Sequence, residues 1–283
     1  MSKVWITTDS TADLSDELFK EYEIEFVSMG ITIGDKFYTD RVDVTPDDIF
    51  HAVEKLNVFP KTSAGLEEDY RAMFERKTKN GDSVIHIALS AELSASHNNA
   101  KRAAEGIDRA YVVDSRVLSS GVGLAAIIAG DMAKKGMKAE EIVKTLNEDI
   151  VPRLVVRFVV DNLKYLHKGG RVSGLKLLGA NLLSIRISLK LENGKMLPDK
   201  KFRGKMPMAI KEFTRDMLET YAADADKEIA FVTLSDVPKE DVAEMEKSVK
   251  AAGFKRVYVT NAGCGITPHC GRGTIGIILL GGK

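Results

Sequence analysis

Hydroxyl side chains gather at the turns that follow predicted strands in the first half of the sequence. They are Ser10 and Thr11, Ser90, Ser94 and Ser96, Ser115, and, after Pro60, Thr62 and Ser63. If these strands are parallel, the turns lie at one edge of a sheet, where helix N-termini offer N–H groups to an anion. The pattern favours a carboxylate or phosphate site. Helix capping is the simpler interpretation of any single turn, because Ser, Thr and Asp are the usual N-cap residues.

Cysteine and histidine occur close together near the C-terminus, at Cys264, His269 and Cys270. A closed zinc site needs four ligands, and the sequence offers no second cluster to complete one. The cysteine spacing is not that of a CxxC redox pair. We therefore expect no metal and no cofactor here, and the role of the two cysteines stays open.

Ser94 and His269 together raise the possibility of nucleophilic catalysis, with an acid such as Asp9 as the third member of a triad. Leu93-Ser94-Ala95 lacks the glycine-flanked GxSxG elbow of many serine hydrolases. The alternative kept from this pattern is a hydrolase of small acyl or phosphate esters, with Ser94 as nucleophile and His269 as base.

The segment from Gly271 to Gly276 matches the GxGxxG pattern of dinucleotide-binding proteins. Such a motif must open a helix whose N-terminus faces the pyrophosphate. Here it leads into the apolar run Ile277 to Leu280, which is typical of a strand. The sequence therefore argues against a nicotinamide or flavin site.

Two basic segments are candidate contacts for a phosphate or a partner. Lys168-Gly169-Gly170-Arg171 follows a short apolar stretch, and Arg203-Gly204-Lys205 ends a predicted strand. Glycine after basic residues is also a common helix ending, so the first segment has a purely structural interpretation as well.

Composition limits the class of protein. The chain has 283 residues, and 41 basic residues balance 41 acidic ones. With no net positive field, nucleic acid is an improbable main partner. The N-terminus has too short an apolar run for a signal peptide or a spanning helix. With only two cysteines, the sequence predicts a cytoplasmic protein without stable membrane insertion.

The order of predicted elements indicates an α/β protein of two domains. Strands at 4–8, 83–89 and 110–113 alternate with helices, which predicts a parallel sheet in an N-terminal domain of residues 1–150. In residues 151–283, strands at 185–191 and 195–202 are joined by Asn193-Gly194, a strong hairpin signal. This second domain is expected to contain a mixed sheet. The apolar segments 122–135 and 175–183 are compatible with a tunnel lining or, by default, with ordinary core.

Several of these segments, taken in order, resemble the DegV family of bacterial fatty-acid-binding proteins. The resemblance lies in Ile6 to Leu14, Pro60 to Ser63, Leu93-Ser94, Asp114-Ser115, Leu163 to Ser173, Arg203 with Lys205, and His269 to Thr274. It covers nearly the whole chain. One departure is Leu93-Ser94-Ala95-Ser96, where the family usually has Leu-Ser-Gly-Thr, so the hydroxyl is kept and the glycine is lost.

The resemblance implies a two-domain DegV-like fold that buries a long-chain fatty acid, for example palmitate. By the family pattern, Thr62 and Ser94 hydrogen-bond the carboxylate, and His269 and Arg203 lie near the head group. Ser63 and Arg171 are further possible head-group or partner contacts. The family also implies a soluble ATP-dependent fatty acid kinase as partner, so the protein would be a non-catalytic carrier. A sensor whose ligand controls another protein would use the same pocket.

Overall fold

A parallel four-stranded sheet organises the first half of the chain in the computed structural model, which describes residues 2–172 and 185–282. Its strand order is β2-β1-β6-β7. The strands are β1 (Val4–Asp9), β2 (Glu25–Val27), β6 (Ser83–Ala88) and β7 (Ala110–Asp114). Every neighbouring pair is parallel, which confirms the predicted βα alternation.

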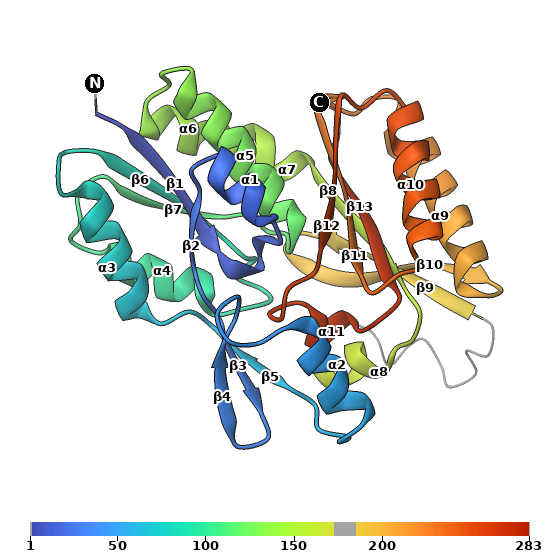
Figure 1. Ribbon diagram of the computed structural model, residues 1–283. Coiled ribbons are helices and arrows are strands. Elements are labelled where there is room, and N and C mark those ends of the chain that lie inside the picture. The colour runs from blue at the N-terminus through green and yellow to red at the C-terminus, as the bar shows by residue number, and fades with distance from the viewer. Residues whose placement is uncertain (1, 173–184, 283) are drawn as a thin grey trace.

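Helices cover both faces of this sheet (Figure 1). On one face lie α3 (Glu67–Thr78) and α4 (Ser96–Ala104), and on the other lies the long apolar helix α5 (Ser120–Lys134). Further helical elements of this half are η1 (Ser10–Ala12), α1 (Asp16–Glu21), α6 (Ala139–Thr145) and η2 (Leu146–Ile150).

A mixed six-stranded sheet organises the second half, in the order β10-β9-β8-β13-β11-β12. Its strands are β8 (Leu154–Val160), β9 (Ile185–Glu192), β10 (Lys195–Arg203), β11 (Ile229–Ser235), β12 (Arg256–Asn261) and β13 (Thr274–Leu280). Only β11 and β12 pair in parallel. The predicted hairpin joins β9 and β10, and both Asn193 and Gly194 have positive φ, as a type I′ turn requires. Helices α9 (Met206–Tyr221) and α10 (Lys239–Ala251) cover the outer face.

Helix α5 lies between the two sheets and joins the halves into one core. It packs on β1 from one side and on β11 and β13 from the other. The largest cluster of buried apolar side chains accordingly runs from Ile6 through Ile127 to Ile278. The short helix α7 (Val151–Arg153) leads directly from η2 into β8 at the predicted domain boundary, and burial continues across it.

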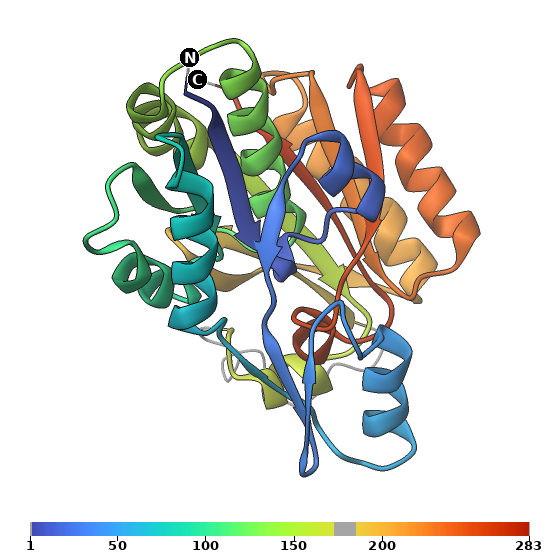
Figure 2. The same ribbon diagram turned by 60° about the vertical axis from the view of Figure 1, so that its left-hand side comes forward.

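A small antiparallel sheet projects from the first half, visible at the bottom of Figure 2. Its order is β4-β3-β5, with β3 (Gly30–Ile33), β4 (Lys36–Thr39) and β5 (Lys61–Ser63). The sequence analysis expected antiparallel pairing only in the second half, and it missed this sheet because strands of three or four residues carry little periodic signal. Helix α2 (Pro46–Glu54) lies between β4 and β5 in the chain, and a capping box of Thr45 and Asp48 begins it.

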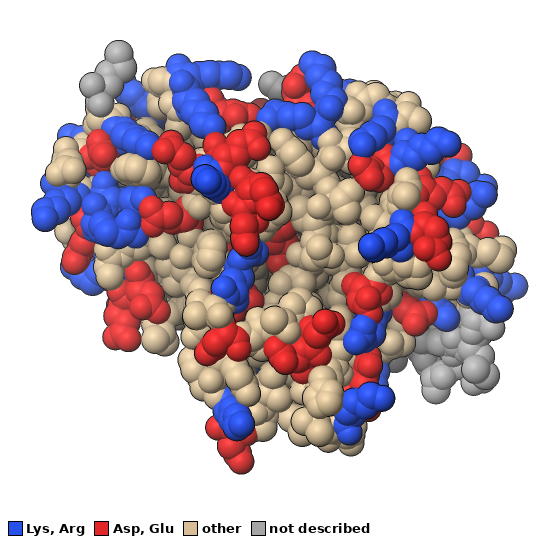
Figure 3. Space-filling view, viewed as in Figure 1, with Lys and Arg blue, Asp and Glu red and all other residues tan. Residues whose placement is uncertain are grey.

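Two short helices, α8 (Lys164–Gly169) and α11 (Thr267–Cys270), pack against each other beside the small sheet. Residues 175–183, a predicted core or tunnel segment, lie outside the described residues. Among the residues described, no helix has the length and apolar character to cross a bilayer. On the face shown in Figure 3, acidic and basic side chains are interspersed, in keeping with the balanced composition.

Candidate ligand-binding site

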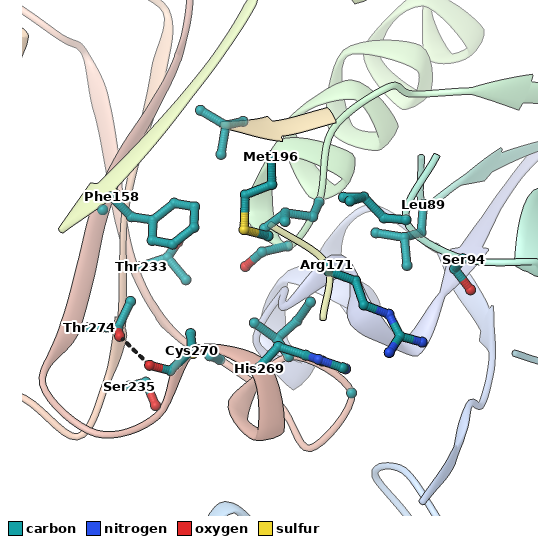
Figure 4. Close-up of a pocket in the computed structure, with 18 of the residues that line it drawn as sticks. Leu89, Ser94, Phe158, Arg171, Met196, Thr233, Ser235, His269, Cys270 and Thr274 are labelled. Carbon is teal, nitrogen blue, oxygen red and sulfur yellow. Dashed lines mark hydrogen bonds between the residues drawn. The ribbon is translucent and has the colours of Figure 1, made fainter. Parts of the chain in front are cut away.

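A cavity of about 210 Å³ lies between the two halves of the chain. Apolar side chains from both halves form most of its wall, among them Met29, Leu89, Leu118, Phe158, Met196 and Ile278. Figure 4 shows these walls closing around a common space. Polar side chains reach it from several separate segments, so the cavity combines a largely apolar interior with a few hydrogen-bonding groups.

Thr62 reaches the cavity from the middle of β5. That strand pairs with β3, with Thr62 opposite Ile31. Because successive side chains of a strand point to opposite faces, Thr62 faces the cavity while Ser63 turns away toward Gly30. Ser63 is exposed and is not part of the wall.

His269 stands beside Thr62, on α11. Its Nε2 lies 2.9 Å from the Thr62 hydroxyl oxygen. Burial, helped by the positive charge of Arg171, lowers the pKa of His269 to about 4, so the imidazole is neutral near pH 7. Its Nδ1 lies against Gly169, where a Cβ would approach to 2.5 Å. The glycine at position 169 therefore makes room for this ring.

Ser94 reaches the cavity from the loop between β6 and α4. Its hydroxyl accepts a hydrogen bond from the Ser96 backbone N–H at 3.2 Å and lies 3.1 Å from the Ser96 hydroxyl. Ser94 is therefore not the N-cap of α4, which is Ala95 and has no side-chain cap; its hydroxyl bonds within the turn that precedes the helix, and the residue lines the cavity. The Ser94 hydroxyl oxygen has two lone pairs and its proton can rotate, so the group can still hydrogen-bond a ligand.

Arg171 lies at the same end of the cavity, just after α8 (Figure 4). Its guanidinium donates to the Gly169 carbonyl at 2.7 Å. Gly170 ends α8 in the left-handed conformation, which confirms the helix-ending interpretation of this segment. Arg203, the last residue of β10, is exposed and does not line the cavity, so it is separate from the other candidates.

This end of the cavity suits a carboxylate. A neutral imidazole carrying its proton on Nε2 would donate to Thr62, which leaves the Thr62 hydroxyl proton free for a ligand. Ser94 offers a second hydroxyl and Arg171 a positive charge. Hydrogen bonds to an ionised acceptor are stronger than neutral ones, and the apolar remainder of the cavity suits a hydrocarbon chain.

The geometry gives no support to a Ser-His-Asp triad. The Nε2 atom of His269 bonds Thr62, whereas Ser94 bonds Ser96. Asp9 is held elsewhere, by the Tyr70 hydroxyl and by the Leu89 N–H at 2.8 Å. A serine nucleophile needs a base within hydrogen-bonding reach, and the described residues place none at Ser94.

The two cysteines occupy different surroundings. Cys264 donates to the Val44 carbonyl in a core beneath the small sheet, and Cys270 lines the cavity. Burial raises the pKa of both thiols, to about 12 for Cys270, so neither is a thiolate at neutral pH. The residues that the structure describes contain no cluster of three His, Cys, Asp or Glu side chains suited to a metal ion.

Of the turn hydroxyls found in the sequence, only Ser94 and Thr62 line the cavity. Ser10 is fully buried and donates to Asp40, and Ser90 donates to the carbonyl of Gly194 in the β9–β10 hairpin. The sequence also missed the apolar wall, including Phe158 and Met196. No signal identifies such residues in advance, because apolar lining and ordinary core have the same pattern.

The glycines that mimic a dinucleotide motif have a packing role. Gly271 and Gly273 precede β13 and Gly276 lies within it, so the motif leads into a strand and not into the helix that a dinucleotide turn requires. Gly271 has φ +72° and lies against the Tyr165 ring, where a Cβ would approach to 2.3 Å. The glycine at position 271 therefore lets the backbone approach the Tyr165 ring closely.

The fold and the cavity together define an α/β protein with two main sheets, a small third sheet and an internal, mainly apolar cavity. The chain belongs to the DegV family, which is described as "Uncharacterised protein, DegV family" and matches residues 3–281. A curated relative from Thermotoga maritima, named "Fatty acid-binding protein", is 31% identical, with 97% of this chain and 96% of the relative covered.

Solved structures agree with this assignment. The fatty-acid-binding DegV family protein from Thermus thermophilus superimposes with a TM-score of 0.88 at 27% identity, covering 99% of each chain. A Thermotoga maritima protein whose structure revealed a fatty-acid-binding function has a TM-score of 0.83 at 28% identity, covering 99% of this chain and 100% of that one. These relatives are described as binding proteins, and their fold is the predicted DegV fold.

Proposed function

We propose that this protein binds a long-chain fatty acid in the cavity, with the carboxylate held by Thr62 and Ser94. The observation that carries the proposal is the convergence of Thr62, Ser94 and His269 with Arg171 at one end of an apolar cavity. These residues come from four separate segments. The fatty-acid binding of relatives that share the fold over nearly their whole length supports the same ligand class.

The energetics assign different roles to the two ends of the ligand. Burial of hydrocarbon contributes about 0.8 kcal/mol per methylene, so a sixteen-carbon acid such as palmitate gains on the order of 10 kcal/mol before the cost of immobilising it. The carboxylate contacts add less and fix the orientation. Affinity therefore resides mainly in the chain, and selectivity for an acid resides in the polar end.

We further propose that the bound carboxylate is presented to a soluble ATP-dependent fatty acid kinase, in the cytoplasm. Arg171 is exposed at the polar end, and Arg203 is exposed at the end of β10, so both are free to meet a partner. On this proposal the protein carries the substrate and the kinase supplies the catalytic groups. Ser63, which is exposed on β5 next to Thr62, is a weaker candidate contact.

The first experiment is native mass spectrometry of the protein purified from a bacterial host, together with an organic extract of the same sample. A fatty acid present in stoichiometric amount is the expected result, and its length and unsaturation identify the chain that is selected. A protein that arrives empty and fails to take up added palmitate would overturn the binding proposal.

A second experiment tests the kinase step. The palmitate-loaded protein is incubated with a bacterial fatty acid kinase and labelled ATP, and acyl phosphate is measured. We expect product only with the loaded protein and less product for Arg203→Ala at equal palmitate loading. Equal rates with the protein and with detergent-dispersed palmitate would contradict a presenting role while leaving the binding proposal intact.

A further inference from the structure

The turn that carries Ser94 is organised by a buried residue outside the cavity wall, Ser90. The Ser90 carbonyl accepts the Leu93 N–H at 3.0 Å and the Ser94 N–H at 3.1 Å. The Ser90 hydroxyl oxygen accepts the Glu92 N–H at 3.3 Å. Ser90 itself does not line the cavity. Because the backbone of Ser94 is bonded to Ser90, the direction of the Ser94 side chain depends on where Ser90 is held.

Ser90 is held in turn by hydrogen bonds from both halves of the chain. Its N–H donates to the carbonyl of Val117, in the loop after β7, at 3.0 Å. Its hydroxyl donates to the Gly194 carbonyl at 2.8 Å, and Ser90 has no exposed surface, so this bond is shielded from water. A buried bond across 104 positions of sequence thus ties the Ser94 turn to the β9–β10 hairpin.

Gly194 suits this contact because it has no side chain. It lies in the left-handed region, with φ +82°, as the hairpin turn requires. A Cβ at this position would approach the Ser90 hydroxyl oxygen to 2.9 Å and the Glu92 side chain to 3.1 Å. The tip of the hairpin therefore packs directly on the turn that carries Ser94.

The same hairpin also reaches the segment of Arg171. Met196, two residues beyond Gly194, lines the cavity (Figure 4) and forms a parallel bridge with Val172. Val172 directly follows Arg171, the positive group at the carboxylate end. One hairpin therefore contacts the segments of both Ser94 and Arg171, which belong to different halves of the chain.

We propose that Ser90 is a positioning residue for fatty-acid binding: its bond to the Gly194 carbonyl fixes the turn that presents the Ser94 hydroxyl to the carboxylate. This inference rests on the proposed function and adds a residue that touches no ligand. A binding group that neighbouring hydrogen bonds already hold in its productive orientation does not have to be ordered by the ligand. Loss of the Ser90 hydroxyl should therefore weaken recognition of the carboxylate, while the apolar walls still hold the chain.

The test compares palmitate with hexadecan-1-ol, which has the same chain length and no negative charge. Delipidated wild-type protein and Ser90→Ala are titrated with both compounds, and Kd is measured. Ser90→Ala should lose about three-fold in affinity for palmitate relative to the alcohol, part of the effect of one hydrogen bond. In the Ser94→Ala background the same change should leave this ratio unaltered, because the hydroxyl that Ser90 positions is then absent.

Thr214→Val is the matched control. It removes a buried hydroxyl that bonds the Ile210 carbonyl within α9, outside the cavity wall, and should keep the wild-type ratio of the two Kd values. Gly194→Ala disturbs the same contact from the other side, because its Cβ would press on the Ser90 hydroxyl, and it should shift the ratio in the same direction as Ser90→Ala. Urea unfolding shows which variants are folded, and Gly194→Ala decides the outcome if Ser90→Ala does not fold.

Equal losses for the acid and the alcohol in Ser90→Ala would overturn the proposal, because Ser90 would then support the fold without acting on the carboxylate. A change of ratio that persists in the Ser94→Ala background would overturn it as well, and so would an unchanged ratio. The proposed function survives each of these results if palmitate binds the wild type more tightly than Ser94→Ala. If palmitate does not bind the wild type, the proposed function fails, and this inference fails with it.

Discussion

Two groups of polar side chains in this protein look alike in the sequence and differ in how completely they are hydrogen-bonded. The first is the buried turn of residues 9–13, after β1. The second is the carboxylate end of the cavity, formed by Thr62 and Ser94. The first group is one short segment, whereas in the second Thr62 belongs to β5 and Ser94 to the loop between β6 and α4.

In the buried turn the polar atoms bond mainly to the protein. Asp9 accepts from Tyr70 and Leu89, and Ser10 donates to Asp40 at 2.6 Å and accepts the Met29 N–H at 3.1 Å. These bonds tie β1 to α3 and to segments that carry cavity residues. The turn therefore shapes the cavity without lining it.

Asp13 extends this network to the C-terminal half. It accepts from the Ser119 hydroxyl and, at 2.8 Å, from the Gly263 N–H. Ser119 lines the cavity, and Gly263 belongs to the loop that leads to α11 and His269. At the carboxylate end, by contrast, Thr62 and Ser94 each have room for another partner. The comparison teaches that most polar atoms of the buried turn hold the structure together, although the Thr11 hydroxyl has no partner among the described residues, whereas the spare bonding capacity of Thr62 and Ser94 lies at the cavity.

The largest expected effect is the loss of stability on removing Asp9. Asp9→Ala leaves the buried Tyr70 hydroxyl and Leu89 N–H without their acceptor, so we expect the free energy of unfolding to fall by about 3 to 5 kcal/mol. Urea denaturation followed by circular dichroism measures it. The control is Asp16→Ala, whose side chain is 89% exposed and should change stability by about 0.5 kcal/mol or less. Similar losses in the two variants would contradict a structural role for the buried turn.

The next effect is a pH dependence that comes from Asp13. Burial raises the pKa of Asp13 to about 7, from 3.8 in an unfolded chain. The folded state therefore binds more protons between these values, and this contribution to stability is present at low pH and lost as the pH rises. Asp13→Asn removes the titration. The free energy of unfolding of the wild type should fall relative to the variant by about 2 to 4 kcal/mol from about pH 4 to about pH 8.

The titration of His269 changes stability with pH in the opposite direction. This contribution is the same in the wild type and in Asp13→Asn. The His269 pKa of about 4 lies below the ordinary 6.5, so the unfolded state binds more protons in between and this part of the stability rises with pH. The difference between the stability–pH profiles of the wild type and Asp13→Asn therefore does not contain the contribution of His269. Parallel profiles for the wild type and Asp13→Asn would show that Asp13 is ionised throughout.

A smaller effect, on affinity rather than stability, is expected at Thr62. Thr62→Ala removes a donor to the carboxylate and should raise the Kd for palmitate about ten-fold, with little change in unfolding. Ser63→Ala is the matched control, since the adjacent side chain of β5 turns away from the cavity. Calorimetric titration of both delipidated variants measures the difference. Equal Kd values would remove Thr62 from the site.

The smallest expected effect is at Ser94. Its hydroxyl shares the loop with Ser96, which lies 3.1 Å away and is positioned to take over part of the interaction. We expect Ser94→Ala to raise the Kd about three- to five-fold and the double variant with Thr62→Ala to bind less tightly than either single variant. Unchanged palmitate binding in both single variants and in the double variant would refute the carboxylate assignment.

The fold was largely predictable because its main elements repeat a strong local pattern. Buried strands such as β6 alternate with apolar helices such as α5, and Asn193-Gly194 specifies its hairpin by backbone conformation alone. The small sheet of β3, β4 and β5 was not predictable in this way. Its short strands owe their pairing to tertiary contacts, and one of them carries Thr62.

The sequence by itself determined the α/β elements, the hairpin and, through its resemblance to a known family, the candidates Thr62, Ser94 and His269. These features depend on neighbouring residues or on motifs that can be compared directly. Only the tertiary structure decided that Thr62 meets His269 across 207 positions of sequence while Asp9 and Ser10 are committed to the core. Whether a hydroxyl is saturated or available depends on partners that the chain brings together only when it folds.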